Sequence, residues 1–137
     1  MQTFTVRSKN HEELIDITDR VREIITAQNI FCGTCHIYTP HTTAAITINE
    51  NADPDVRRDI LKGLAGLGLE KIQFSHQEGN SPAHIKSSII GCSEIIFIEE
   101  GAILMGTWQG IFFCEFDGPR TRKVLVKIIG QNPSVRT

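Results

Sequence analysis

The chain has 137 residues, of which 40% are hydrophobic and 22% charged, and 14 basic and 16 acidic residues leave a net charge of −2. This length and composition are typical of one soluble globular domain, 1–137. The balanced charge predicts no nucleic-acid partner, and no apolar run approaches the ~20 residues of a membrane span, so we expect no membrane partner. The N-terminus has no signal-peptide core, which predicts a cytoplasmic protein.

The first half of the chain alternates strands with helices. Period-two alternation predicts strands, and apolar residues three or four positions apart predict helices. These patterns place strands at 2–8, 31–39 and 42–49, a helix at 17–27, and a helix from Asp53-Pro54 to the glycines at 63, 66 and 68.

The second half begins with a short helix and continues as strands. Ser81 is a good N-cap, Pro82 suits the first helical position, and Gly91 can end the helix. Alternation then predicts strands at 94–98, 102–107, 108–116 and 120–129. On the third of these strands, one face is expected in the core: Trp108, Gly110, Phe112, Cys114 and Phe116. Strands interleaved with short helices, followed by an antiparallel meander, indicate an α+β fold.

The four cysteines do not form an evident functional set. Cys32 and Cys35 resemble a redox or zinc pair, but a spacing of three on a strand turns their side chains to opposite faces. No helix start is predicted there to lower a thiol pKa, and no second pair completes a four-cysteine zinc site. We interpret the cysteines as packed thiols.

The segment from His76 to Gly91 is the main candidate for a working site. His84 falls at the third position of the predicted helix, where the helix dipole disfavours a positive charge and a neutral, metal-binding imidazole is expected. The free amides of the same first turn form a potential anion site.

A partner for this segment is His41, at the corner between two strands beside small residues. Together, His41, His76 and His84 would suit a zinc ion with an open coordination position. From spacing alone this signal is weak, because corner histidines in loops are commonly polar surface residues.

Other polar residues have both structural and functional interpretations. Glu115 shares a strand face with Gln109, which indicates a partly buried cleft or an interface. Glu50 lies roughly 30 Å along an extended chain from His41, so the two would meet only across subunits or through a bend.

Arg120 follows a Gly-Pro turn and is either a phosphate clamp or a surface residue. Asn80 is either a turn residue or a second contact to an anion beside Ser81.

Three long segments resemble the YjbQ-like family, also described as secondary thiamine-phosphate synthases. They are PHTTAAITINENADPDV, GNSPAHIKSSIIG and GTWQGIFFCEFDGPR, and they occur in the family's order along nearly the whole chain. The resemblance implies a compact, β-sandwich-like α+β domain with short helices that assembles as a homotrimer. It also implies a transferase that joins a hydroxymethylpyrimidine diphosphate to a thiazole phosphate and releases diphosphate.

The resemblance also implies roles for individual residues. The family's histidines match His41, His76 and His84, which would bind a divalent metal such as zinc or contact phosphate directly. Asn80 and Ser81 lie between the last two of these histidines. In our leading hypothesis, Asn80, Ser81, the amide of Ala83 and Arg120 hold a phosphorylated small-molecule substrate, and Glu115 and His84 are catalytic. The alternative functions are a metal-dependent hydrolase of a phosphorylated or amide substrate, and a non-catalytic trimeric protein that binds a small anion.

Overall fold

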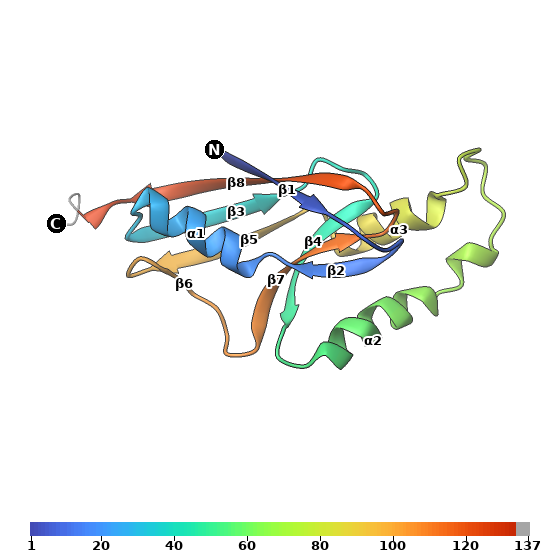
Figure 1. The fold of residues 1–137 in the computed structure, drawn as a ribbon, viewed down its shortest axis with the longest axis horizontal. Coiled ribbons are helices and arrows are strands. Elements are labelled where there is room, and N and C mark those ends of the chain that lie inside the picture. The colour runs from blue at the N-terminus through green and yellow to red at the C-terminus, as the bar shows by residue number, and fades with distance from the viewer. Residues whose placement is uncertain (134–137) are drawn as a thin grey trace.

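The computed structural model describes residues 1–133, which form two antiparallel sheets and three α-helices (Figure 1). The five-stranded sheet has the order β1 (Gln2–Arg7), β8 (Thr121–Gln131), β3 (Cys32–Tyr38), β5 (Ser93–Glu99) and β6 (Ala102–Ile103). The three-stranded sheet has the order β2 (Glu13–Asp16), β7 (Gln109–Glu115) and β4 (Ala44–Glu50). The helices are α1 (Thr18–Gln28), α2 (Pro54–Ala65) and α3 (Ser81–Ile90), with a 3₁₀ turn at Leu69–Lys71. This confirms the predicted sandwich-like α+β fold.

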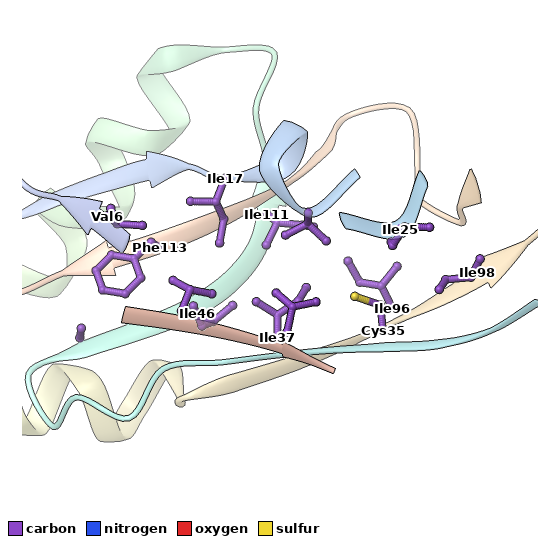
Figure 2. Packing of buried hydrophobic residues seen from close by; sticks show 14 residues of the cluster. Val6, Ile17, Ile25, Cys35, Ile37, Ile46, Ile96, Ile98, Ile111 and Phe113 are labelled. Carbon is purple, nitrogen blue, oxygen red and sulfur yellow. The ribbon is translucent and has the colours of Figure 1, made fainter. Parts of the chain in front are cut away.

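The main core lies between the two sheets and is closed by α1. Figure 2 shows side chains from both sheets and from α1 pointing toward one another. Alternate residues of each strand supply this core, as the period-two pattern predicts. Its buried members include Val21, Ile25, Cys35, Ile37, Ile46, Ile96, Ile98, Ile111, Phe113, Val124 and Val126.

A second core lies on the other face of the three-stranded sheet. Phe112, Cys114 and Phe116 of the β7 region pack there with Ala83 of α3, and half-buried apolar residues of α2 cover them. Strand β7 is therefore buried on both faces, and both of its alternating sets are core residues. The prediction that Trp108 belongs to the core is wrong: its side chain is 62% exposed, because it precedes β7 in the loop from β6.

Local signals place most helix ends correctly. Asp53 caps α2, where its carboxylate accepts the amide of Asp55 at 2.9 Å, and Gly91 ends α3 with a φ of 99°. The predicted cap of α3 is wrong by one residue: Asn80 is the N-cap, and Pro82 occupies the second helical position. Proline fits there as well, because the first-turn amides have no partner within the helix. His84 is consequently the fourth helical residue.

Most strand boundaries differ by one or two residues from the prediction, and two differences are larger. The short β2 was not predicted, and the predicted strand 102–107 shrinks to Ala102–Ile103. All four cysteines are free. Cys35 and Cys114 are packed thiols, and burial raises the pKa of Cys35 to about 11, whereas Cys32 is half-buried and Cys92 is exposed. Among the described residues, no helix has the length and apolar character needed to cross a membrane.

Candidate functional site

His41 lies in the corner between β3 and β4, and this corner is attached to β8 by two hydrogen bonds. The hydroxyl of Thr39 donates to the Lys123 carbonyl at 3.0 Å, and the Lys123 amide donates to Nε2 of His41 at 2.9 Å. Because Nε2 accepts, the neutral ring carries its proton on Nδ1. Burial, followed by the positive charge of Arg122, lowers the pKa of His41 from its usual 6.5. The imidazole is therefore a neutral donor at pH 7.

His76 and His84 come from different elements and meet edge to face. His76 lies in the loop between the 3₁₀ turn and α3, and His84 lies in the first turns of α3. Their ring centroids are 5.7 Å apart with an interplanar angle of 83°. The fold thus brings the two histidines of the candidate segment together.

The turn between β7 and β8 supplies the next group. Arg120 donates from Nε to the Asp117 carbonyl at 2.7 Å and from Nη2 to the Asp117 carboxylate at 2.9 Å. Asn80 donates from Nδ2 to the same carboxylate at 2.9 Å and to Glu78 at 2.7 Å. Asp117, interpreted from the sequence as a turn residue, therefore connects the turn to the start of α3. It also orients the half-exposed Arg120 guanidinium.

Beneath this turn lies a buried ion pair between Glu115 and Arg122. Their side chains are 0% and 4% exposed, and Nε of Arg122 donates to both Glu115 oxygens at 2.9 and 3.2 Å. Burial alone would raise the pKa of Glu115, but the hydrogen bonds from Arg122 and Ser8 and from the Asp117 amide outweigh it and lower the pKa. Glu115 is thus an ionised carboxylate, enclosed by protein donors.

These elements surround one pocket of about 340 Å³ at the end of the sandwich where α3 lies. It is lined by His41, Thr42, Thr43, His76, Glu78, Asn80, His84, Asp117, Arg120 and Arg122. Its lining is mostly polar, and the two carboxylates at its wall already accept hydrogen bonds from Arg120 and Asn80. We call it the histidine pocket. An adjoining hollow of about 590 Å³ shares His41, Thr42 and His84 and extends toward Tyr38 and Cys92.

Some predicted site residues lie outside this pocket. Ala83 is buried in the second core, and the amides of Ala83 and His84 donate to the Asn80 carbonyl at 3.0 and 3.4 Å. Pro82 has no amide proton, so the expected cradle of helix amides is largely closed. Ser81 begins α3 without lining the pocket. Glu50 and Gln109 pair in register at the far end of the three-stranded sheet.

The three histidines do not fit a three-ligand metal site as they are arranged. Nε2 of His41 is occupied by the Lys123 amide, and its other ring nitrogen carries the proton. Within the described part of the chain, no group of three His, Cys, Asp or Glu side chains is placed to hold a metal ion. Metal binding by these histidines stays a prediction, and no step proposed below depends on it.

Sequence reasoning missed Arg122, although a signal was present. Arg122, Val124 and Val126 alternate on β8, and the two valines are fully buried. An arginine in phase with core residues requires a buried counter-ion, and Glu115 was already suspected of partial burial. Combining the two observations would have predicted the ion pair.

The hydrogen bond from the Lys123 amide to Nε2 of His41 leads to a testable prediction about which ring nitrogen carries the proton. In nitrogen–proton correlation spectra, the neutral His41 ring is expected in the form with the proton on Nδ1. Its titration midpoint should lie below 6.5, because burial and Arg122 disfavour the charged ring. As the pH falls through this range the unfolded chain binds more protons, so stability should fall by at most ~1.4 kcal/mol per pH unit from this group. A proton on Nε2, or a midpoint above 6.5, would contradict this geometry.

Comparison with known proteins identifies close relatives. The model of the family described as UPF0047 protein YjbQ-like matches residues 2–131. The UPF0047 protein MJ1081 of Methanocaldococcus jannaschii is 54% identical over 127 residues, covering 93% of this chain and 92% of that protein. The UPF0047 protein YugU of Bacillus subtilis is 46% identical over 131 residues, covering 95% and 99% of the two chains.

Solved structures show the same fold. An uncharacterized conserved protein of the YjbQ/UPF0047 family from Clostridium acetobutylicum superposes with a TM-score of 0.92 at 50% identity, covering 94% of this chain and all of that chain. A protein of unknown function from Sulfolobus solfataricus, described as YbjQ-like, gives a TM-score of 0.91 at 34% identity, covering 95% and 96%.

Proposed function

The chain belongs to the UPF0047 YjbQ-like family, and we propose that it is a transferase acting on phosphorylated small molecules, with thiamine-phosphate synthase activity. The observation that carries this proposal is the histidine pocket itself. Three histidines and two arginines from separate parts of the sequence line one small, polar pocket. Such a set of N–H donors suits a phosphoryl group better than an apolar ligand.

The proposed reaction joins a hydroxymethylpyrimidine diphosphate to a thiazole phosphate. The thiazole ring nitrogen forms a bond to the exocyclic methylene carbon of the pyrimidine, and the C–O bond from that carbon to the diphosphate breaks. The diphosphate leaves with the electron pair, and the thiazole nitrogen becomes positively charged, so no proton has to be removed.

The protein's part in this step would be electrostatic. Negative charge grows on the oxygen of the leaving diphosphate, and preorganised donors facing that oxygen lower the barrier. Arg120, oriented by Asp117, and the paired rings of His76 and His84 are placed at the pocket to supply such donors. The adjoining hollow beside Tyr38 and Cys92 offers room for the rest of the substrate.

The proposal is tested by mixing the purified protein with the two substrates and measuring thiamine phosphate and diphosphate. Equal amounts of both products, formed at a rate proportional to protein concentration, are expected. If diphosphate binds but no product forms, the non-catalytic anion-binding function replaces this one. If diphosphate is released without thiamine phosphate, the protein is a hydrolase instead.

We also propose that the protein assembles as a homotrimer through the outer face of its five-stranded sheet. This face carries Tyr38, Ile95, Phe97 and Ile129, whose exposed fractions are 42%, 57%, 59% and 57%. Strand register places all four on one face of β3, β5 and β8, where Thr34 lies between Phe97 and Ile129 and Ile95 lies opposite His36. Several large exposed apolar side chains gathered on one sheet face are typical of a surface that another subunit covers.

The trimer proposal predicts a change in assembly when charge enters this face. The double variant Ile95→Asp/Phe97→Asp is expected to behave as a folded monomer in light scattering after size exclusion, while the wild type has three times the mass of the chain. Glu23→Gln, on the exposed side of α1 and away from this face, is the control and should leave the mass unchanged. A monomeric wild type would contradict the proposal.

A further inference from the structure

Arg122 is a buried cation at the floor of the histidine pocket. It follows the Gly118–Pro119 turn on β8, and its side chain points to the inner side of the sheet in phase with Val124 and Val126. Only 4% of it is exposed, yet it is among the residues that line the pocket. We therefore interpret the small exposed part of the Arg122 side chain as facing the histidine pocket.

The guanidinium of Arg122 is held in place by the four hydrogen bonds that it donates most closely. Nε donates to both oxygens of Glu115, and Nη2 donates to Glu115 and to the Thr43 hydroxyl, the latter at 2.8 Å. A weaker contact of 3.3 Å joins Nη2 to the Thr43 carbonyl. Glu115 is itself held by the Ser8 hydroxyl at 2.6 Å and the Asp117 amide at 3.1 Å. The planar group thus has a defined orientation before any ligand arrives.

The remaining nitrogen, Nη1, has no hydrogen-bond partner among the described residues. The buried side-chain atoms without a partner in that part of the chain are Arg57 Nε and Asn80 Oδ1, so Nη1 is not sealed in the interior. Nη1 therefore keeps some contact with solvent, and the residue that carries it lines the histidine pocket. His41, the neutral donor, lines the same pocket.

A purely structural role explains this arrangement poorly. A buried ion pair stabilises a fold no better than apolar residues of similar volume, because both charges lose their hydration. Here the fold also leaves one charged N–H group directed at a polar pocket. The pair of Glu115 and Arg122 carries no net charge. Its attraction for an anion therefore depends on the direction of the unpaired N–H groups of Arg122, and these favour a ligand oxygen placed on the pocket floor.

We propose that Arg122 is the residue that receives the anionic group of the ligand, and that Glu115 is the positioning residue that orients it. Arg120, half exposed at the rim, is then an outer contact. This inference rests on the proposed function only in taking the ligand to be a phosphoryl compound. In the complex, Arg122 Nη1 donates a hydrogen bond to the deepest oxygen of that phosphoryl group.

The test is calorimetric titration of the purified protein with inorganic diphosphate. A hydrogen bond between charged groups contributes ~1.5–3 kcal/mol, so Arg122→Met should weaken binding by roughly 10- to 100-fold. Arg122→Lys, which keeps the charge without the planar group, should lose less. Arg7→Met on the neighbouring strand β1, where Arg7 lies opposite Thr121, is the matched control and should bind as the wild type does.

A measurement on the wild type keeps the proposal testable if the Arg122 variants do not fold. The Nε–H resonance of Arg122 should shift when diphosphate is added, and the shift should saturate with the calorimetric dissociation constant. Diphosphate binding without that shift, or unchanged binding by a folded Arg122→Met protein, would overturn the proposal, as would a wild type that binds no diphosphate. Binding that depends on Arg122 but yields no thiamine phosphate would instead contradict only the proposed transferase.

Discussion

Glu115→Gln is expected to lower the free energy of unfolding by about 3–5 kcal/mol, because it leaves the Arg122 guanidinium buried without its counter-ion. Glu115 is fully buried, and its oxygens accept hydrogen bonds from Arg122, Ser8 and the Asp117 amide. A loss of this size is a large part of the ~5–15 kcal/mol that stabilises a typical domain. Urea unfolding, monitored at fixed protein concentration, measures it.

A double variant tests whether the unpaired charge of Arg122 causes this loss of stability. Glu115→Gln/Arg122→Met removes the unpaired charge, so it should recover much of the stability that Glu115→Gln loses. Glu99→Gln, on an exposed carboxylate of β5, should change stability by less than ~0.5 kcal/mol. If Glu115→Gln is as stable as the wild type, the ion pair does not hold this end of the sandwich together.

The same pair makes the stability depend on pH in a defined direction. The pKa of Glu115 in the folded protein lies below its usual 4.5, so the folded state keeps the charge to lower pH than the unfolded state does. Its contribution is therefore complete above pH 4.5 and is lost as the pH falls through the lowered value. Glu115→Gln should lack this part of the acid destabilisation.

His84→Gln is expected to lower kcat/KM for thiamine-phosphate formation by about 100- to 1,000-fold, the effect of removing one preorganised donor from a developing negative charge. His84 is half-buried at the start of α3 and faces His76, so glutamine of similar length should be accommodated without unfolding the helix. Steady-state rates with both substrates provide the measurement.

His11→Gln is the matched control for this variant. His11 lies in the exposed loop before β2, and its ring contacts only the Gly118 carbonyl, at 3.4 Å, among its side-chain hydrogen bonds. It should keep nearly full activity. A His84→Gln enzyme with wild-type kinetics would show that the histidine pair does not act on the reacting groups.

The sequence was sufficient to predict the fold class and to select three histidines that line one pocket, but it did not predict the buried ion pair beneath that pocket. His41, His76 and His84 line one pocket because the ends of β3 and β7 and the start of α3 lie at the same end of the sandwich. Their proximity was expected mainly from the family resemblance. Alternation on β7 predicted one core face, whereas both faces are buried, since period two cannot show what packs on the second face.

The start of α3 shows why helix caps are hard to place from sequence. Asn80 and Ser81 are both good capping residues, and Pro82 favoured Ser81. In the structure, the Asn80 side chain contacts Glu78 and Asp117, and its carbonyl accepts the first amides of the helix. Tertiary contacts, invisible to local rules, decide the cap and close the expected amide cradle.

The central claim is that the histidine pocket receives a phosphoryl group, and a crystal structure of the protein with diphosphate tests it most directly. The expected result is diphosphate density between His84 and Arg122, with one oxygen about 2.7–2.9 Å from Arg122 Nη1, the length of a charge-assisted hydrogen bond. Diphosphate bound elsewhere on the chain, with this pocket holding only water at saturating ligand, would contradict it.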